Sequence, residues 1–164
     1  MPIITTDIKY RLSGGAANTD QNASLGGAKS TTEASAALFD DVLSDEATAG
    51  DVEYRCFYVH NAHATLTMLT AKAWIQANTP SGDTTLAMGL GTSAVNATEQ
   101  VVANEGVAPT GVTFSAAADE AGSIALGDIP PGQHRAVWLR RTVTAGAAGF
   151  ADSANLRVKC DTLP

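Results

Sequence analysis

Apolar and polar side chains alternate with a period of two in several stretches of this sequence. The longest stretch runs from Asp51 to Gln76, where two alternating runs flank the polar segment 60–64. Successive side chains of a strand point to opposite sides of a sheet, so this period predicts two long strands joined by a short connection. Since one face is amphipathic, we expect one side of this sheet to meet water or a partner.

The same alternation predicts further strands at residues 8–12, 84–90, 134–144 and 153–160, and shorter strand-like pieces near 101–102, 112–114 and 124–126. Turn-forming clusters separate them, and those at 60–64 and 79–83 fit hairpins between antiparallel neighbours. Pro130 and Pro131 lack amide donors, which keeps the piece before them out of the middle of a sheet. With hardly any helix, the pattern predicts an all-β fold, a single antiparallel β-sandwich of immunoglobulin-like or jelly-roll-like type.

Residues 1–30 are expected to form an N-terminal extended arm or irregular lead-in, ahead of a sandwich domain at residues 31–164. The segment SGGAANTDQNASLGGAKS contains two Gly-Gly pairs and many small polar residues, which are typical of turns and loops. Its glycines do not form a phosphate-binding loop, because the GxxxxGK[ST] pattern is missing. An arm lying on a neighbouring subunit and a disordered tail are both compatible with this composition.

Residues 30–50 fit two structures. Ser30 with Glu33 resembles a helix capping box, and the apolar residues of 38–43 would then form one helix face. Alternatively, ALFDDV forms a short strand followed by a loop. The acidic residues nearby do not have the spacing of an EF-hand, so we expect a solvated acidic loop and no metal site; they are Asp40, Asp41, Asp45 and Glu46.

Composition narrows the function classes. The chain has 164 residues, of which 16% are charged, against about 25% in an average domain. A lightly charged surface is a hint of assembly with other chains. The net charge of −7 argues against a nucleic-acid partner, because phosphate contacts need clustered Lys and Arg. No apolar run reaches 18 residues, so we expect no membrane partner, and the N-terminus has no pattern of a secretory signal.

No catalytic motif is evident, so we expect a protein that is not an enzyme and has no cofactor. The histidines are His60, His63 and His134; two of them lie three apart on a turn, which is too few ligands for a metal site. Cys56 and Cys160 belong to no zinc or CxxC spacing, and we expect free thiols, although a disulfide joining the two ends of the domain remains open.

Two stretches resemble immunoglobulin-like sandwiches: YRCFYVHNAHATLTMLTAKAWIQ and LGDIPPGQHRAVWLRRTV. From about Ile8 to its end the chain also resembles small structural proteins of tailed bacteriophages. In those proteins an arm like SGGAANTDQNASLGGAKS recurs together with segments like LFDDV, GDVEYRCFYV and VWLRRTV. The resemblance implies a capsid decoration (cement) protein. The alternative is a neck, tail or baseplate component, or a receptor- or carbohydrate-binding module of the tail.

This resemblance also implies a partner and a location. The partner would be the major capsid protein, and the chain would act in the virion, which is assembled in the host cytoplasm. Decoration proteins of this kind favour homo-oligomers, in particular trimers, and their binding stabilises the assembled shell by mass action. We expect contacts from Tyr10, Leu12 and Leu25 of the arm and from an exposed Trp74, for which core packing is the alternative.

Overall fold

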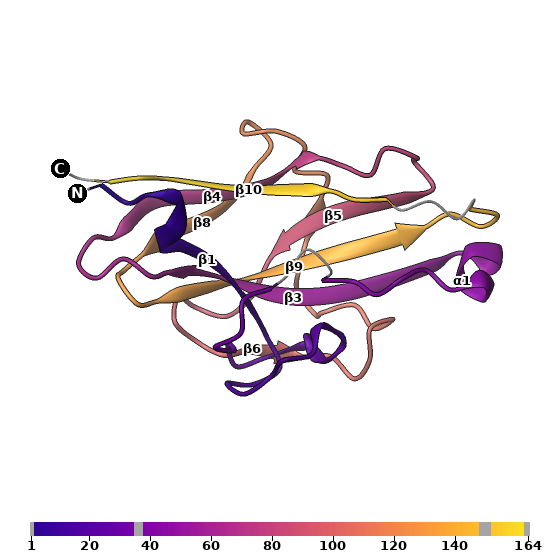
Figure 1. The fold of residues 1–164 in the computed structure, drawn as a ribbon, viewed down its shortest axis with the longest axis horizontal. Helices are drawn as coiled ribbons and strands as arrows, with labels where there is room; N and C mark the ends of the chain where they lie inside the picture. The colour runs from indigo at the N-terminus through magenta and orange to yellow at the C-terminus, as the bar shows by residue number, and fades with distance from the viewer. Residues whose placement is uncertain (1, 35–37, 148–151, 163–164) are drawn as a thin grey trace.

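Two antiparallel sheets packed against each other form the body of the protein in a computed structural model, which describes residues 2–34, 38–147 and 152–162 (Figure 1). The larger sheet has the strand order β1 (Ile8–Leu12), β3 (Asp51–Asn61), β9 (His134–Val143), β5 (Thr84–Leu90) and β7 (Phe114–Ser115). The smaller sheet has the order β10 (Asn155–Asp161), β4 (Met68–Ala77) and β8 (Ile124–Ile129). The predicted all-β antiparallel sandwich is therefore confirmed.

The remaining elements are short. A two-stranded sheet pairs β2 (Gly26–Gly27) with β6 (Glu99–Val101). The helical segments are α1 (Ser44–Ala49) and the 3-10 turns η1 (Thr5–Asp7) and η2 (Gln21–Ala23). Within the described ranges, none of these helices is long and apolar enough to cross a membrane. The end of β10 and the N-terminal segment lie at one end of the molecule, and α1 lies at the other (Figure 1).

The main core lies between the two sheets. Alternate residues of each long strand point inward, as the period of two requires. Their apolar side chains form one buried cluster, which includes Phe57, Val59, Met68, Ile75, Met88, Leu126, Ile129, Val137 and Leu139. At about 25 cal/mol per Å² of apolar surface removed from water, this cluster is the main source of stability of the sandwich.

Part of the other face of the larger sheet is also buried, under segments of the same chain. Cys56, Tyr58 and Trp138 are completely buried there and pack with Val102, which follows β6. The Tyr58 hydroxyl donates to the Gly27 carbonyl and accepts a hydrogen bond from the Glu99 amide at 3.0 Å, which ties the small sheet to β3. The expectation that one side of the predicted sheet meets water or a partner does not hold along this part of β3, but it does hold on β4, where Thr70 and Gln76 are exposed.

The predicted hairpins at 60–64 and 79–83 are wrong. β3 and β5 belong to the larger sheet and β4 to the smaller one, so both connections cross between sheets. β3 has no free edge for β4, because β9 pairs along one edge, at residues 51–60, and β1 pairs along the other, at residues 57–61. Where β1 ends, the carbonyls of Ser24 and Glu105 accept from the Cys56 and Tyr54 amides, each at 2.8 Å.

Residues 8–30, assigned to an arm by their sequence, are hydrogen-bonded to the sandwich of the same chain. β1 pairs with β3 over its whole length, and the Leu12 amide donates to the Thr32 carbonyl at 3.1 Å on its other side. The Ser13 hydroxyl donates to the Cys56 carbonyl at 2.9 Å. A contact of this segment with a neighbouring subunit stays a prediction.

Neither structure expected for residues 30–50 is present in the described part of that stretch, which omits 35–37. Glu33 forms an isolated bridge with Arg11 and does not begin a helix. The helix begins at Ser44, where the Glu46 carboxylate accepts from the Leu43 amide at 2.7 Å. The capping signal thus lies 13 residues further along the chain than predicted, because the sandwich draws residues 30–34 alongside β1.

Candidate functional site

Two arginines and three carboxylates converge near the α1 end of the sandwich. Glu53 and Arg55 come from β3, Arg141 from β9, Asp40 from the segment before α1, and Glu105 from the loop after β6. We call these five residues the arginine–carboxylate cluster. Glu53 and Arg55 lie on the same side of β3 as the core residue Phe57, so the strand itself carries charges into the interior.

β3 and β9 bring the first ion pair together directly. Glu53 is opposite Arg141 in the register of the two strands, and both Nε and Nη2 of Arg141 bind Oε2 of Glu53. Nη1 of Arg141 donates to the Asp40 carbonyl at 2.6 Å, and Nη2 lies 3.5 Å from Oδ1 of Asp40. Arg141 therefore connects the sheet to the segment that leads into α1.

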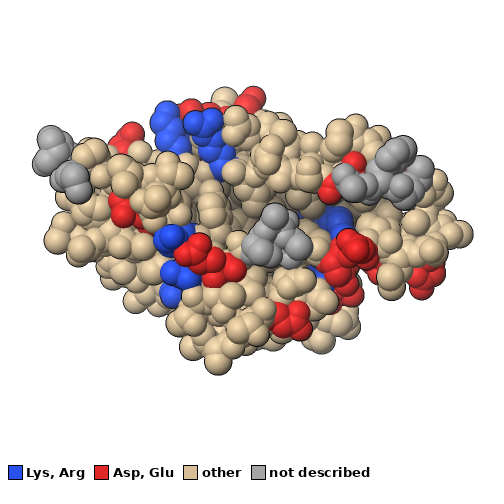
Figure 2. Space-filling model, viewed as in Figure 1, with Lys and Arg blue, Asp and Glu red and all other residues tan. Residues whose placement is uncertain are grey.

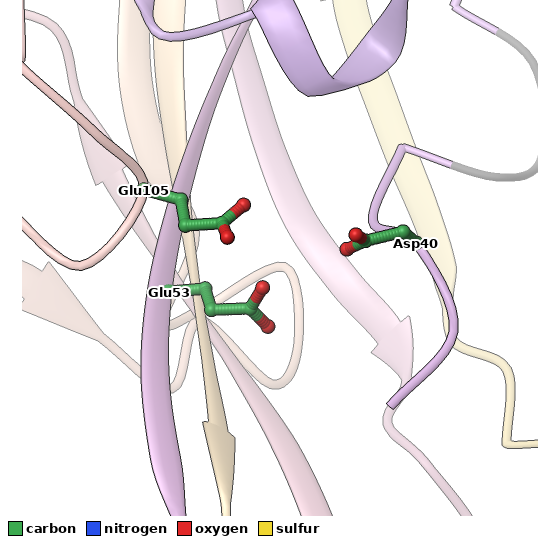
Figure 3. Close-up of side chains that lie close together, drawn as sticks. All are labelled: Asp40, Glu53 and Glu105. Atoms are coloured by element: carbon green, nitrogen blue, oxygen red, sulfur yellow. The ribbon is translucent and has the colours of Figure 1, made fainter. Parts of the chain in front are cut away.

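Arg55 makes the second set of contacts, from a completely buried side chain. Its Nη2 binds Oε2 of Glu105 and lies 3.5 Å from Oδ1 of Asp40 and 3.4 Å from Oδ1 of Asn22. Figure 3 shows Glu53 and Glu105 side by side, with their carboxylates directed toward Asp40 across a gap. The ion pairs to Asp40 show that the two guanidinium groups bridge this gap.

The ring of Phe39 completes the cluster. The guanidinium carbons of Arg55 and Arg141 lie 5.6 Å and 5.0 Å from its centroid. Such cation–π contacts contribute about 0.5 to 2 kcal/mol, more where water is excluded. Phe39 therefore holds the segment before α1 against both arginines.

The arginine–carboxylate cluster has three carboxylates for two guanidinium groups, and the excess negative charge affects the buried Glu53 most. Burial raises the pKa of Glu53, the nearby Arg141 opposes that rise, and the Glu105 carboxylate adds to it. Glu53 is 1% exposed, and its Oε1 has no hydrogen-bond partner among the described residues. The arrangement braces four chain segments against one another. Two of its buried carboxylate oxygens, Oε1 of Glu53 and Oδ1 of Asp40, have no hydrogen-bond partner among the described residues, although Oδ1 of Asp40 lies 3.5 Å from both guanidinium groups.

A second buried carboxylate lies beside β6, where Glu99 is 2% exposed. The amides and hydroxyls of Thr92 and Ser93 all donate to its two oxygens, at 2.7 to 3.2 Å. Burial raises the pKa of Glu99, but these hydrogen bonds outweigh it and hold the pKa at about 2. This carboxylate fastens the loop after β5 to the small sheet and is fully satisfied, in contrast to Glu53.

The residues predicted to contact a partner are mainly packed within the chain. Leu12 is 3% exposed and Trp74 7%. The Arg157 guanidinium, from the neighbouring strand β10, lies 5.9 Å from the Trp74 ring, so the expected exposure of Trp74 is wrong. Tyr10 and Leu25 are half-buried against the two apolar clusters. Contact roles for these four residues stay predictions.

The two histidines that lie close together in the fold are His60 and His134, although His60 and His63 are closer in the sequence. His63 is an acceptor in a turn, where its Nδ1 receives the amides of Thr65 and Leu66 at 3.1 and 3.0 Å. His60 and His134 are opposite each other in β3 and β9. Burial and nearby positive charge lower the pKa of His134 to about 4, so its neutral ring packs edge-on with the ring of Tyr58.

Both cysteines are free thiols, as expected. Cys56 is completely buried in β3, and Cys160 is half-buried in β10, a strand of the other sheet. Burial raises the pKa of both thiols, which lowers their reactivity.

The visible surface is lightly charged. In Figure 2 acidic and basic side chains lie in small mixed groups separated by wide neutral areas. Among the described residues, Lys9 pairs with Glu33 at 3.0 Å, and Lys72 and Lys159 pair with Glu120 at 2.9 and 2.7 Å. Exposed pairs of this kind contribute little to stability.

Comparisons with known proteins add no relative: no family model, curated protein or solved structure matches this chain.

The sequence alone did not predict the arginine–carboxylate cluster, because Asp40 was expected to belong to a solvated loop. One signal could have revealed it. Glu53 and Arg55 occupy the face of a predicted strand that continues as Phe57 and Val59, and charges on an apolar face require partners inside the fold.

Proposed function

We propose that this chain is a structural protein of a tailed-bacteriophage virion, and that it decorates the outer surface of the head by binding the major capsid protein. The segments that resemble small virion proteins support the proposal, as does the low content of charged residues, 16%. The all-β sandwich provides a rigid body for such a role.

The observation that carries the proposal is the arginine–carboxylate cluster. Its charged groups bind mainly one another, and they fix the loop after β6 and the segment before α1 to the sheet. A binding module whose loops are already ordered loses little conformational entropy when it docks. The cluster thus favours a protein that works by binding as a rigid unit.

Exposed apolar side chains are the candidate contacts. Val101 of β6 is 70% exposed, Leu43 before α1 is 58% exposed, and Ile4 is 54% exposed. Docking on the head would remove the apolar surface of each of these side chains from water. Trp74, in contrast, would affect binding only through the stability of the fold, because it is already buried.

The test uses heads assembled from the major capsid protein without decoration. Added protein should bind in a saturable way, produce extra density on the outer surface, and raise the temperature at which the heads melt. Val101→Ser should weaken head binding and leave the melting of the free protein unchanged, while Trp74→Ala should lower that melting temperature.

Antibody labelling of intact virions provides a second readout. Uniform label over the head is expected. Label confined to the tail tip, or heads that neither bind the protein nor gain stability, would refute the proposal. Sedimentation of the purified protein tests the expected trimer, and a monomer at all concentrations would contradict that part.

A further inference from the structure

Three carboxylates from α1 and the start of β3 lie close together beside the arginine–carboxylate cluster. Glu46 of α1 and Asp51 and Glu53 of β3 each place one oxygen within 4.8 Å of the others. Glu53 is buried, and the other two are half-buried. We propose that Glu46, Asp51 and Glu53 form a binding site for Ca²⁺, an inference that goes beyond the proposed function and does not depend on it.

The unsatisfied oxygen of Glu53 points to a ligand. Arg141 binds Oε2 of Glu53, and Oε1 has no hydrogen-bond partner in the part of the chain that the structure describes, although Glu53 is 1% exposed. A buried carboxylate oxygen without a partner costs free energy, which either a proton or a cation can recover. One oxygen of Glu53 lies within 4.8 Å of carboxylate oxygens of Glu46 and Asp51. Three negative charges this close repel one another, which favours a bound cation.

The local charge balance supports the same conclusion. The two overlapping groups of acidic residues share Glu53 and contain five carboxylates, and two guanidinium groups accompany them, which leaves a formal charge of −3. The other group is Asp40, Glu53 and Glu105 (Figure 3). The arginines already bridge it, so a cation has no need to bind there.

The frame around the proposed site is held in place by backbone contacts. Gly50 joins α1 to β3 with φ +79°, and its amide donates to the Glu46 carbonyl at 2.7 Å. A Cβ at this position would lie 3.1 Å from backbone atoms of Val143 and Ala145, and the positive φ strains any other residue, so glycine is favoured here. The Gly146 amide donates to the Ala47 carbonyl at 2.8 Å, which anchors α1 to the turn after β9.

The donor set indicates the kind of cation. All three side chains offer carboxylate oxygens, which hard cations prefer over softer metals. Ca²⁺ accepts six to eight oxygens in irregular geometry, and water can supply the remaining ligands, while Mg²⁺ requires a near-ideal octahedron. Ca²⁺ bound here would link α1 to β3 and neutralise part of the excess negative charge.

The test titrates Ca²⁺ into the purified full chain by calorimetry and follows thermal unfolding. Sites with few protein ligands bind Ca²⁺ with Kd of about 0.1 to 1 mM. At a Ca²⁺ concentration 100 times Kd, the melting temperature should rise by about 5 to 10 °C. Choline chloride at equal ionic strength measures the effect of screening the net charge of −7 alone.

Two variants locate the site. Glu46→Gln keeps an oxygen that can accept from the Leu43 amide, so the helix start is preserved, and Asp51→Asn changes a half-buried side chain. Each should weaken Ca²⁺ binding at least tenfold. Asp45→Asn is the matched control, because it removes one exposed charge from the same helix and should bind Ca²⁺ as the wild type does.

Two results would overturn the proposal. One is a melting shift in Ca²⁺ no larger than in choline chloride, with no saturable heat of binding. The other is wild-type Ca²⁺ affinity in both Glu46→Gln and Asp51→Asn. Equal affinity for Mg²⁺ and Ca²⁺ would overturn the assignment to Ca²⁺.

Discussion

The buried carboxylate of Glu99 makes a specific prediction about acid stability. Glu99→Gln removes the charge and places an amide NH₂ group against donors from Thr92 and Ser93. The pKa of Glu99 is about 2 in the folded protein, against an ordinary value of 4.5. At about 1.4 kcal/mol for each pH unit, this difference corresponds to about 3 kcal/mol of stability, which is available to the ionised residue because it is 2% exposed.

The sign of the pH dependence follows from the direction of the pKa change. Since the pKa of Glu99 is lower in the folded state, its contribution is fully present above about pH 4.5 and is lost as the pH falls from there toward 2. Glu99→Gln should therefore be less stable than the wild type by about 3 kcal/mol at pH 7, and the difference should shrink steadily below pH 4.5.

Urea unfolding at a series of pH values, followed by tryptophan fluorescence, measures both free energies of unfolding. Asp41→Asn controls for the loss of one negative charge, because Asp41 is exposed. It should follow the wild-type pH profile. If the difference between wild type and Glu99→Gln were the same at pH 7 and pH 3, the hydrogen bonds to Glu99 would not be holding an ionised carboxylate, and the reasoning would fail.

Three further predictions use other parts of the fold. Gly91→Ala would place a Cβ against the Glu99 carboxylate and 2.6 Å from the Cβ of Ala136, and should lower the free energy of unfolding by about 1 to 3 kcal/mol in the same urea assay. Gly106→Ala is the control and should leave that free energy unchanged, because its Cβ would lie 3.5 Å from the side-chain oxygen of Asn104. Arg141→Met leaves the buried carboxylate of Glu53 unpaired and should lower the free energy of unfolding by about 3 to 5 kcal/mol. Arg157→Met, on the exposed face of β10, should lower it by less than about 1 kcal/mol, and equal losses would contradict a stabilising role of the arginine–carboxylate cluster. In the native protein the completely buried thiol of Cys56 should resist a thiol reagent that modifies the half-buried Cys160. Rapid modification of both thiols before urea is added would show that the face of the larger sheet around Cys56 opens readily.

Local alternation was enough to identify the long strands. β3, β4, β5, β9 and β10 all lie within a residue or two of their predicted positions, because the period of two is a property of each strand by itself. The same pattern could not predict which strands pair. A polar turn is compatible with a hairpin or with a crossing between sheets, and the outcome depends on which strand edges are already occupied.

The buried charges show the same contrast between what the local sequence pattern predicts and what the tertiary structure decides. The sequence determined that Glu53 and Arg55 share a face of β3 with apolar residues. Only the tertiary structure decided that Arg141 lies opposite on β9, that Asp40 and Glu105 arrive from distant segments, and that Glu46 and Asp51 gather beside Glu53. The physical reason is that side-chain direction is set by local backbone geometry, whereas the partners of a buried charge come from chain segments brought together by the packing of the whole core.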